Sequence, residues 1–516
     1  MKSSAIISLF AVLSSVSGSA QTLSLYQQGL IALQQNRPAE ALRALTAAEQ
    51  ENPRDAPIRN FRGIALAQLG RGEDAAEEYR EAIRLDPQMV DAYRNLGHLE
   101  WTERRLDSAR AALNKAIDLS PDDPYAHYYL GRVELDLKNY PEAVTHLEKS
   151  KSVWPSDGEL YLQAAAAYAS VHRMVDGREV LARVQHLNLT DAQAVRLGAL
   201  RMACQQPEEG LAVFQRLNAR SPDAQWAQFD LALAYLEARQ PEEAERVARS
   251  LPVSKRSGAA WAVIGIAEAE MQRHEEAIQA LRVAAEIGSE EEAGWLNLTR
   301  ELMEQLHYVD AVAAAEQAVS HLPRSYALRL RLGAAYMKSM HYKEAEDVFR
   351  DLIAKGDPEP TSAIGLAQVL MRKGRSEEAA QVLDEAQKRL GSSFLLAYFH
   401  GIMLSRTARP EEALQQLREA VRLNPQSADA HQWLGKAELR AMQIDQAIAD
   451  LSEALRLDPN NQPARRLLAQ AYAIRKQPDQ AAKYLREIKP GEVPKTVGDE
   501  SADFLFPAWE SPPAVQ

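Results

Sequence analysis

The chain repeats one pattern of small and large apolar positions along nearly its whole length. A small residue, replaced once by threonine, returns every 34 residues, or every 33 at two places, at Gly29, Gly63, Gly97, Gly131, Ala165, Gly198, Ala232, Gly265, Thr299, Gly333, Ala367, Gly401, Gly435 and Ala469. Twelve residues after each stands an alanine or glycine, and four residues later a leucine, tyrosine or phenylalanine, except at Ala248 and Ala315. Because apolar residues three or four apart share one face of a helix, each copy predicts two amphipathic helices. The small residues allow these helices to pack closely.

Prolines mark where the predicted helices begin and end. Five of them lie three residues before the alanine or glycine of the second helix: Pro38, Pro207, Pro241, Pro410 and Pro478. Proline fits the first turn of a helix, where its missing N–H has no partner to lose. Eight others lie where the second helix must stop: Pro53, Pro87, Pro121, Pro155, Pro222, Pro323, Pro425 and Pro459. Each copy is therefore a pair of helices with defined ends.

This unit resembles the tetratricopeptide repeat. The segment Arg94-Asn95-Leu96-Gly97, followed by Ala109 and Leu113, is close to the consensus of that family. The resemblance extends over roughly residues 22–489. It implies an all-α fold, a right-handed α-solenoid of about fourteen helix-turn-helix repeats, in which the first helix of each pair lines a concave groove.

The N-terminal residues have a different pattern. Lys2 precedes an apolar stretch from Ala5 to Val16, and small residues follow up to Ala20. This order is typical of a cleaved secretory signal, so we expect residues 1–20 to be removed and the protein to be periplasmic or secreted. The stretch is shorter than the ~20 residues that span a bilayer, although a retained anchor is an alternative. No later segment predicts a membrane span.

Composition and motifs argue against several classes of function. The formal net charge of -12 disfavours a nucleic-acid-binding surface. Cys204 is the only cysteine, so neither an intramolecular disulfide nor a multi-thiolate metal site can form. None of the common nucleophile, zinc or phosphate-loop motifs is present. We therefore expect a protein that is not an enzyme and that needs no cofactor or metal.

Two copies of the repeat are degenerate. The fifth has Ala164-Ala165 in place of the usual Leu-Gly, and the seventh continues after Ala248 into the segment Pro252–Gly258. Since each repeat contacts mainly its neighbours, weak copies predict hinges near residues 185–190 and 252–258. An ordinary surface loop in a rigid solenoid is the alternative.

At one position of the repeat, which forms a column when the copies are aligned, the side-chain charge changes sign along the chain. Five residues after the small residue of the first helix stand Asp136, Glu237, Glu270 and Glu304, and then Lys338, Arg372, Arg406 and Arg440. Met303, Met337 and Met371 directly precede three of these positions. The resemblance implies that both columns face the groove, which predicts a site for an acidic, partly apolar peptide. A solvated charge run beside core methionines is the alternative.

Two functions are compatible with these patterns. The first is a protein-binding scaffold of the cell envelope or secreted space, with protein or peptide partners in the groove. The second is an accessory or carbohydrate-binding subunit of an envelope enzyme or polysaccharide-export complex. Aromatic platforms would favour the second, and Trp101, Tyr125, Tyr128 and Tyr129 form one candidate, with core packing as the alternative reading.

The repeats end near Lys489, and residues 490–516 are rich in proline and acidic residues. Phe504, Phe506 and Trp509 give this tail an apolar cluster between acids. It could cover the last helix pair, dock on a partner or remain disordered. Because it is both acidic and aromatic, it is also a candidate to occupy the groove in cis.

Overall fold

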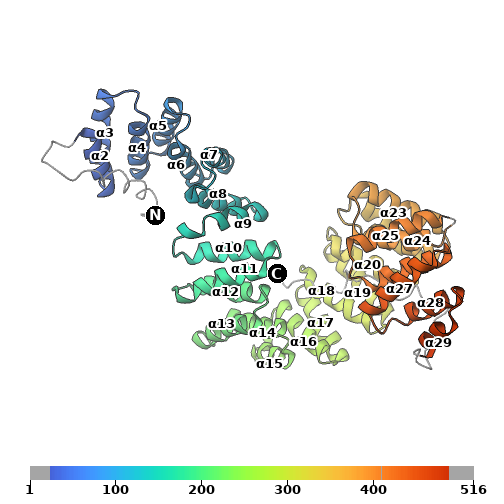
Figure 1. Ribbon diagram of the computed structural model, residues 1–516. Helices are drawn as coiled ribbons and strands as arrows, with labels where there is room; N and C mark the ends of the chain where they lie inside the picture. Colours follow the sequence, from blue (N-terminus) through green and yellow to red (C-terminus); the bar gives the residue numbers. More distant parts are fainter. Residues whose placement is uncertain (1–23, 408, 487–516) are drawn as a thin grey trace. The chain divides into compact units, whose positions relative to one another are not determined.

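The computed structural model describes residues 24–407 and 409–486, apart from the side chain of residue 185 (Figure 1). These residues form helices and connecting turns. They divide into two compact units, residues 1–239 and 240–516. The twenty-eight α-helices of the described residues, α2 to α29, form fourteen consecutive pairs, which confirms the predicted all-α repeat fold. Even-numbered helices are the first of each pair and odd-numbered helices the second.

The N-terminal unit contains thirteen of these helices. They are α2 (Leu25–Gln34), α3 (Pro38–Glu51), α4 (Ala56–Gln68), α5 (Gly72–Leu85), α6 (Val90–Thr102), α7 (Leu106–Leu119), α8 (Pro124–Asp136), α9 (Tyr140–Lys149), α10 (Gly158–Ser170), α11 (Met174–Ala182), α12 (Asp191–Ala203), α13 (Pro207–Arg220) and α14 (Gln225–Glu237). Two short 3₁₀ helices, η1 (Lys151–Val153) and η2 (Arg183–His186), follow α9 and α11.

The C-terminal unit contains the other fifteen. They are α15 (Pro241–Ser250), α16 (Gly258–Glu270), α17 (His274–Ile287), α18 (Glu292–Glu304), α19 (Tyr308–His321), α20 (Tyr326–Lys338), α21 (Tyr342–Ala354), α22 (Thr361–Arg372), α23 (Ser376–Leu390), α24 (Phe394–Leu404), α25 (Pro410–Leu423), α26 (Ala428–Arg440), α27 (Ile444–Leu457), α28 (Gln462–Ile474) and α29 (Pro478–Arg486). The 3₁₀ helix η3 (Val253–Lys255) follows α15.

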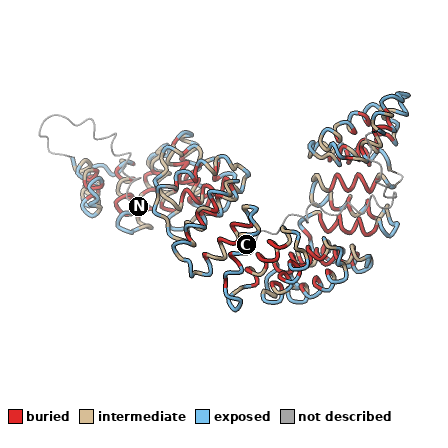
Figure 2. Tube along the Cα trace, turned by 90° about the horizontal axis from the view of Figure 1, so that it is seen from below, coloured by how far each residue is buried: buried red, intermediate tan, exposed pale blue. Residues whose placement is uncertain are grey.

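In most pairs within a unit, the two helices pack through a small residue on the first and a large one on the second. A methyl group built on Gly97 would lie 2.5 Å from Cγ of Leu113, and one built on Gly265 would lie 2.6 Å from Cγ of Leu281. The large residue therefore fills the space that a side chain on the glycine would need. Buried residues consequently follow each helix where it faces its neighbours, while the turns are exposed (Figure 2).

Helix ends follow the sequence signals. Second helices begin at Pro38, Pro207, Pro241, Pro410 and Pro478, as predicted. Most first helices begin with a side-chain cap; for example, the Asp55 carboxylate accepts a hydrogen bond from the backbone N–H of Ile58 at 3.1 Å. Seven of the eight predicted stop prolines lie two residues after the last helical residue. Pro155 is the exception, because η1 lies between it and the end of α9.

Buried glutamates link successive repeats. Glu134 in α8 accepts hydrogen bonds from Arg110, on the second helix of the preceding repeat, at 2.8 Å and 3.1 Å. Equivalent pairs join Arg80 to Glu100, Arg249 to Glu268 and Arg418 to Glu438. A buried carboxylate is unfavourable unless it is paired, so each arginine fixes the contact between two repeats.

Three second helices end early. Most contain 13–15 residues, but α9 and α15 contain 10 and α11 contains 9, and each of the three is followed by a 3₁₀ helix. The sequence singled out the copies with α11 and α15, whereas the early end of α9 was not predicted. Whether residues 185–190 and 252–258 act as hinges stays a prediction.

Candidate functional site: the first-helix face of the C-terminal unit

Four cations close four successive first helices of the C-terminal unit, and we call them the basic row. Lys338, Arg372 and Arg440 are the last residues of α20, α22 and α26, and Arg406 lies two residues beyond the end of α24. Glu270 and Glu304 occupy the same place in α16 and α18. The charge therefore changes sign between α18 and α20, within one unit.

The basic row is accessible and also contacts the helix ends. Arg372, Arg406 and Arg440 are exposed, and Lys338 is half-buried. The Arg440 guanidinium donates a hydrogen bond to the backbone carbonyl of Ser405, at the C-terminus of α24, at 2.9 Å. Because the C-terminus of a helix carries partial negative charge, cations there are favourable. The row thus has a structural role beside any role in binding.

The three methionines next to the row pack against the core. Met337 is only 7% exposed and belongs to the hydrophobic cluster of α20 to α26. Met303 and Met371 are half-buried and pack against neighbouring clusters. All three therefore contribute to the packing of the first helices.

A second polar group lies one or two helical turns before the ends of the first helices α18, α20 and α22. It consists of Asn297 and Arg300 on α18, Arg331 on α20 and Gln368 on α22, and we call it the buried polar cluster. Arg331 is 8% exposed and the Arg300 side chain 16%. Polar side chains at such positions are uncommon in a layer of helix contacts, since burial without compensation is unfavourable.

The charges of the cluster act on one another. Burial, reinforced by the positive charge of Arg300 and partly offset by Glu304, lowers the pKa of Arg331 to about 10. The Glu304 carboxylate lies 3.8 Å from Nε of Arg300. Arg300 and Arg331 are thus close enough for each charge to act on the other, with Glu304 beside them.

The aromatic residues singled out in the N-terminal unit come together on α6 and α8. Tyr128 and Tyr129 are buried, and Tyr125 and Trp101 are half-buried. The Trp101 indole N–H donates to the Asp136 carboxylate at 2.7 Å, and the Arg132 guanidinium lies 5.0 Å from the Trp101 ring centroid. One face of the Trp101 ring thus already has a cation of the protein over it.

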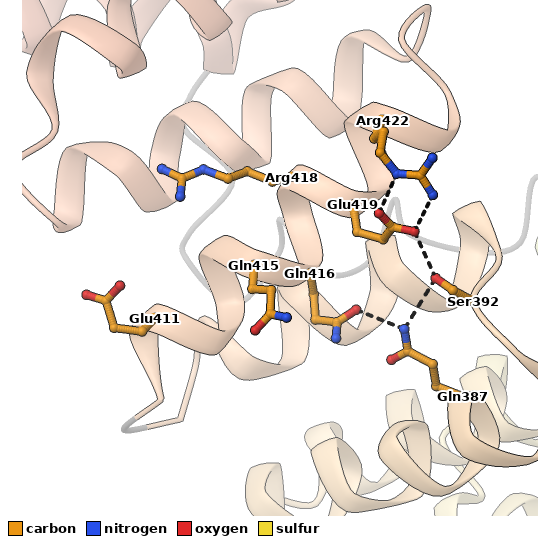
Figure 3. A pocket seen from close by; sticks show the side chains of 8 residues that line it. All are labelled: Gln387, Ser392, Glu411, Gln415, Gln416, Arg418, Glu419 and Arg422. Carbon is orange, nitrogen blue, oxygen red and sulfur yellow. Dashed lines mark hydrogen bonds and ion pairs between the residues drawn. The ribbon is translucent and has the colours of Figure 1, made fainter.

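The second-helix side of the C-terminal unit has a polar pocket of about 480 Å³ between α23 and α25 (Figure 3). Its lining groups bind one another: Gln387 donates to Gln416 at 3.2 Å, and Arg422 pairs with Glu419 at 2.7 Å. Ser392 joins the two pairs by hydrogen bonds to Gln387 and Glu419, so these five side chains are engaged with one another.

Other candidate chemistry is sparse in the part of the chain that the structure describes. No group of three or more His, Cys, Asp and Glu side chains there is placed to hold a metal ion. None of the helices among residues 24–407 and 409–486 is long and apolar enough to cross a membrane. Cys204 is buried, and burial raises the pKa of its thiol. The predicted signal and the tail residues Phe504, Phe506 and Trp509 lie outside the described residues.

The helix pairs and their first-helix face define a repeat protein of the helical, partner-binding kind. Two sequence models of the tetratricopeptide repeat match the chain, one over residues 26–90, 94–157, 335–393 and 401–461 and the other over residues 202–265, 302–362 and 438–492. Together they cover more than half of the chain, which therefore belongs to the tetratricopeptide repeat family.

Similarity to characterised proteins is confined to short stretches. The chain is 28% identical over 109 residues to Superkiller protein 3 of Schizosaccharomyces pombe, which is 21% of this chain and 8% of that protein. It is 35% identical over 83 residues to the Cell division cycle protein 27 homolog of Caenorhabditis elegans, which is 16% of this chain and 10% of that protein. The chain thus matches no more than a tenth of either relative.

Solved structures are similar at low identity. Yeast Tom70 gives a TM-score of 0.44 with 15% identity, over 84% of this chain and 99% of that chain. The APC/C hetero-tetramer Cut9-Hcn1 gives a TM-score of 0.37 with 13% identity, over 87% of this chain and 96% of that chain.

The sequence identified the basic row but not the buried polar cluster. The basic row was visible in the sequence because the residues at its repeat position change from acidic to basic along the chain. The cluster occupies the columns two residues before and one residue after the small residue, where Val263 and Ile266 stand one repeat earlier. Both repeat positions hold polar residues in other repeats as well, for example Arg196 and Asp230, so they gave no signal in the sequence.

Proposed function

We propose that the protein is a non-catalytic scaffold that binds extended acidic segments of other proteins along the first helices of its C-terminal unit. The observation that carries the proposal is the sign change within that unit, from Glu270 and Glu304 to the four cations of the basic row. An acidic segment gains favourable contacts along the row and is repelled before it, so the charges fix where it binds.

The spacing of the row suits an extended chain. Neighbouring packed helices lie about 8–10 Å apart, so successive first helices lie roughly 10–20 Å apart. An extended segment rises about 3.3 Å per residue and needs roughly three to six residues between two cations. A partner with acids at such intervals can contact several members of the row at once.

We further propose that the scaffold works in the cell envelope or the secreted space. Lys2 and the apolar stretch from Ala5 to Val16 support export. A fusion of residues 1–30 to a reporter that is active only after export tests this part in a Gram-negative host. Activity that disappears when residues 1–23 are deleted is expected, whereas equal activity of both fusions contradicts export through this segment.

Binding is tested with a fluorescent oligoglutamate peptide. In the variant Lys338→Glu, Arg372→Glu, Arg406→Glu and Arg440→Glu, we expect affinity to fall at least tenfold. The matched control reverses four exposed cations on or directly after the second helices of the same repeats, Lys355, Arg389, Arg422 and Arg456. Because both variants change the net charge equally, equal losses would mean non-specific attraction and would contradict the proposal.

A further inference from the structure

Leu485 on α29 is exposed at a repeat position that is buried in every earlier repeat. It is 55% exposed, whereas the residues at the same position of the thirteen earlier repeats, from Leu45 to Leu451, are 6% exposed or less. Phe349 shows the cause, because a methyl group built on Gly333 of its own repeat would lie 2.8 Å from its ring and one built on Gly365 of the next first helix 2.6 Å. The large residue is thus covered from both sides, and the described residues end at α29 without a following helix.

Two further apolar residues of this helix pair lack the same cover. Ala482 lies three residues before Leu485 on the same face of α29 and is half-buried, whereas Ile448, one repeat earlier, is 9% exposed. Ala473 on α28 is exposed and occupies the repeat position of Trp101, which donates to Asp136 on the following first helix at 2.7 Å. We call Ala473, Ala482 and Leu485 the end face.

The helix pair that carries the end face is strongly basic. Residues 462–486 contain six basic residues and one acidic residue, whereas the preceding pair, residues 428–457, contains three basic and five acidic residues. Lys483 and Arg486 on α29 are both exposed next to the end face. Two copies of the chain that met through this face would bring like charges together, which disfavours a second copy as its cover.

The chain that follows α29 has the opposite charge and supplies large apolar side chains. Residues 490–516 contain five acidic residues and one lysine. Phe504, Phe506 and Trp509, with acids on both sides, are called the tail aromatics below. Seventeen residues separate Arg486 from Phe504. A linker of this length spans roughly 20–25 Å on average and gives its far end an effective concentration in the millimolar range, so the tail outcompetes a dilute external partner for a nearby surface.

We propose that the tail docks in cis on the end face, with the tail aromatics over its apolar residues and the acids of the tail beside Lys483 and Arg486. Pro507 interrupts a helix within the aromatic segment, so the tail covers the face as an extended segment and not as a further helix. A tail held there does not occupy the basic row. The proposal is independent of the proposed function, because it concerns a different surface.

Hydrogen exchange of the full-length protein tests whether the tail covers the face. The aromatic variant carries Phe504→Ser, Phe506→Ser and Trp509→Ser, and its matched control carries Val493→Ser, Val497→Ser and Val515→Ser, three apolar tail residues outside the cluster. Relative to α20 in the same sample, we expect exchange in α28 and α29 to rise at least fivefold in the aromatic variant and less than twofold in the control. Unchanged protection in the aromatic variant, or equal rises in both, would overturn the proposal.

A peptide added in trans locates the docking surface. The full-length aromatic variant is titrated with a labelled peptide of residues 498–516, which we expect to bind. Adding Lys483→Glu and Arg486→Glu should weaken this binding at least tenfold, whereas adding Arg372→Glu and Arg406→Glu, which change the net charge equally, should alter it less than twofold. Absence of binding, or a greater loss with the basic-row pair, would overturn the proposal.

Two further measurements exclude the other arrangements. We expect the aromatic variant to bind the oligoglutamate peptide within twofold of wild type, and tighter binding would show that the tail occupies the basic row and would overturn the proposal. We also expect the aromatic variant to sediment as the same species as wild type. A dimer in which α28 and α29 stay protected without the tail aromatics would assign the end face to a second copy.

Discussion

The guanidinium of Arg440 reaches back from the end of α26 to the backbone carbonyl of Ser405 at the end of α24, 2.9 Å away. One member of the basic row therefore links two successive first helices and compensates the C-terminal partial charge of the earlier one. The same side chain is exposed, so it remains accessible to a partner.

The link predicts a measurable contribution to stability. Arg440→Met removes the hydrogen bond and the cation, and we expect the C-terminal unit to lose about 0.5–1.5 kcal/mol. Hydrogen exchange of α24, compared with that of α20 in the same sample, measures the effect locally. Unchanged exchange in α24 would show that the contact contributes nothing.

The packing of small against large residues predicts a compensating pair of substitutions. Gly265→Ala forces a methyl group against Leu281 and is expected to destabilise by about 1–3 kcal/mol. Leu281→Ala leaves a cavity and is expected to destabilise by about 2–5 kcal/mol. Because each change relieves part of the other, the double variant should lose less than the sum, as measured by denaturant unfolding. Strict additivity would contradict the contact.

A buried carboxyl group predicts a pH dependence. Burial, with the nearby charge of Asp450, raises the pKa of Glu438 to about 7, well above that of an unfolded chain, ~4.3. The folded state then binds the proton more tightly than the unfolded state does. The resulting contribution to stability is complete below the pKa of the unfolded state and is lost as the pH rises through about 7. We expect α26 and α27 to exchange faster at pH 8 than at pH 5.5, after correction for intrinsic rates.

Substitution isolates this effect. The glutamine in Glu438→Gln cannot ionise, so the loss of stability between pH 5.5 and pH 8 should become smaller. Glu453→Gln on α27 is the control, because the hydrogen bond from Arg456 lowers the pKa of Glu453 and the group is already ionised at pH 5.5. An undiminished pH dependence in Glu438→Gln would assign it to another group.

The segment after α15 predicts a protease-sensitive junction. Lys255 and Arg256 are trypsin sites in the segment predicted to be a hinge, and Lys255 and Val253 are exposed. Limited proteolysis should cut here before it cuts at Arg422, which is exposed near the end of the regular helix α25. Equal cleavage rates would contradict a hinge at residues 252–258.

Fold and site differ in how much the sequence revealed. Gly265 and Leu281 belong to columns that recur fourteen times with few exceptions, so the pairing of helices could be read directly. Met337 shows where such reading stops, because the sequence left a place in the groove and a place in the core both open, and the structure shows it 7% exposed within the core. Burial depends on how neighbouring repeats pack, and the residues at one repeat position do not specify that packing.

The buried polar cluster shows the same limit. Arg300 and Arg331 are 31 residues apart, and their mutual charge effect arises only when α18 and α20 lie side by side. The early end of α9 was missed for another reason. Its repeat has regular small and large positions, and the 3₁₀ helix η1 follows where the sequence indicated a normal stop at Pro155.

The most direct test of the account locates the natural partner on the chain. Full-length protein is crosslinked in extracts of its own cells, and the crosslinked sites are identified by mass spectrometry. We expect sites on the first helices from α20 to α26, and their loss in the basic-row variant but not in the second-helix control. Crosslinks that fall on the second helices or on the N-terminal unit, and persist in the basic-row variant, would contradict the central claim.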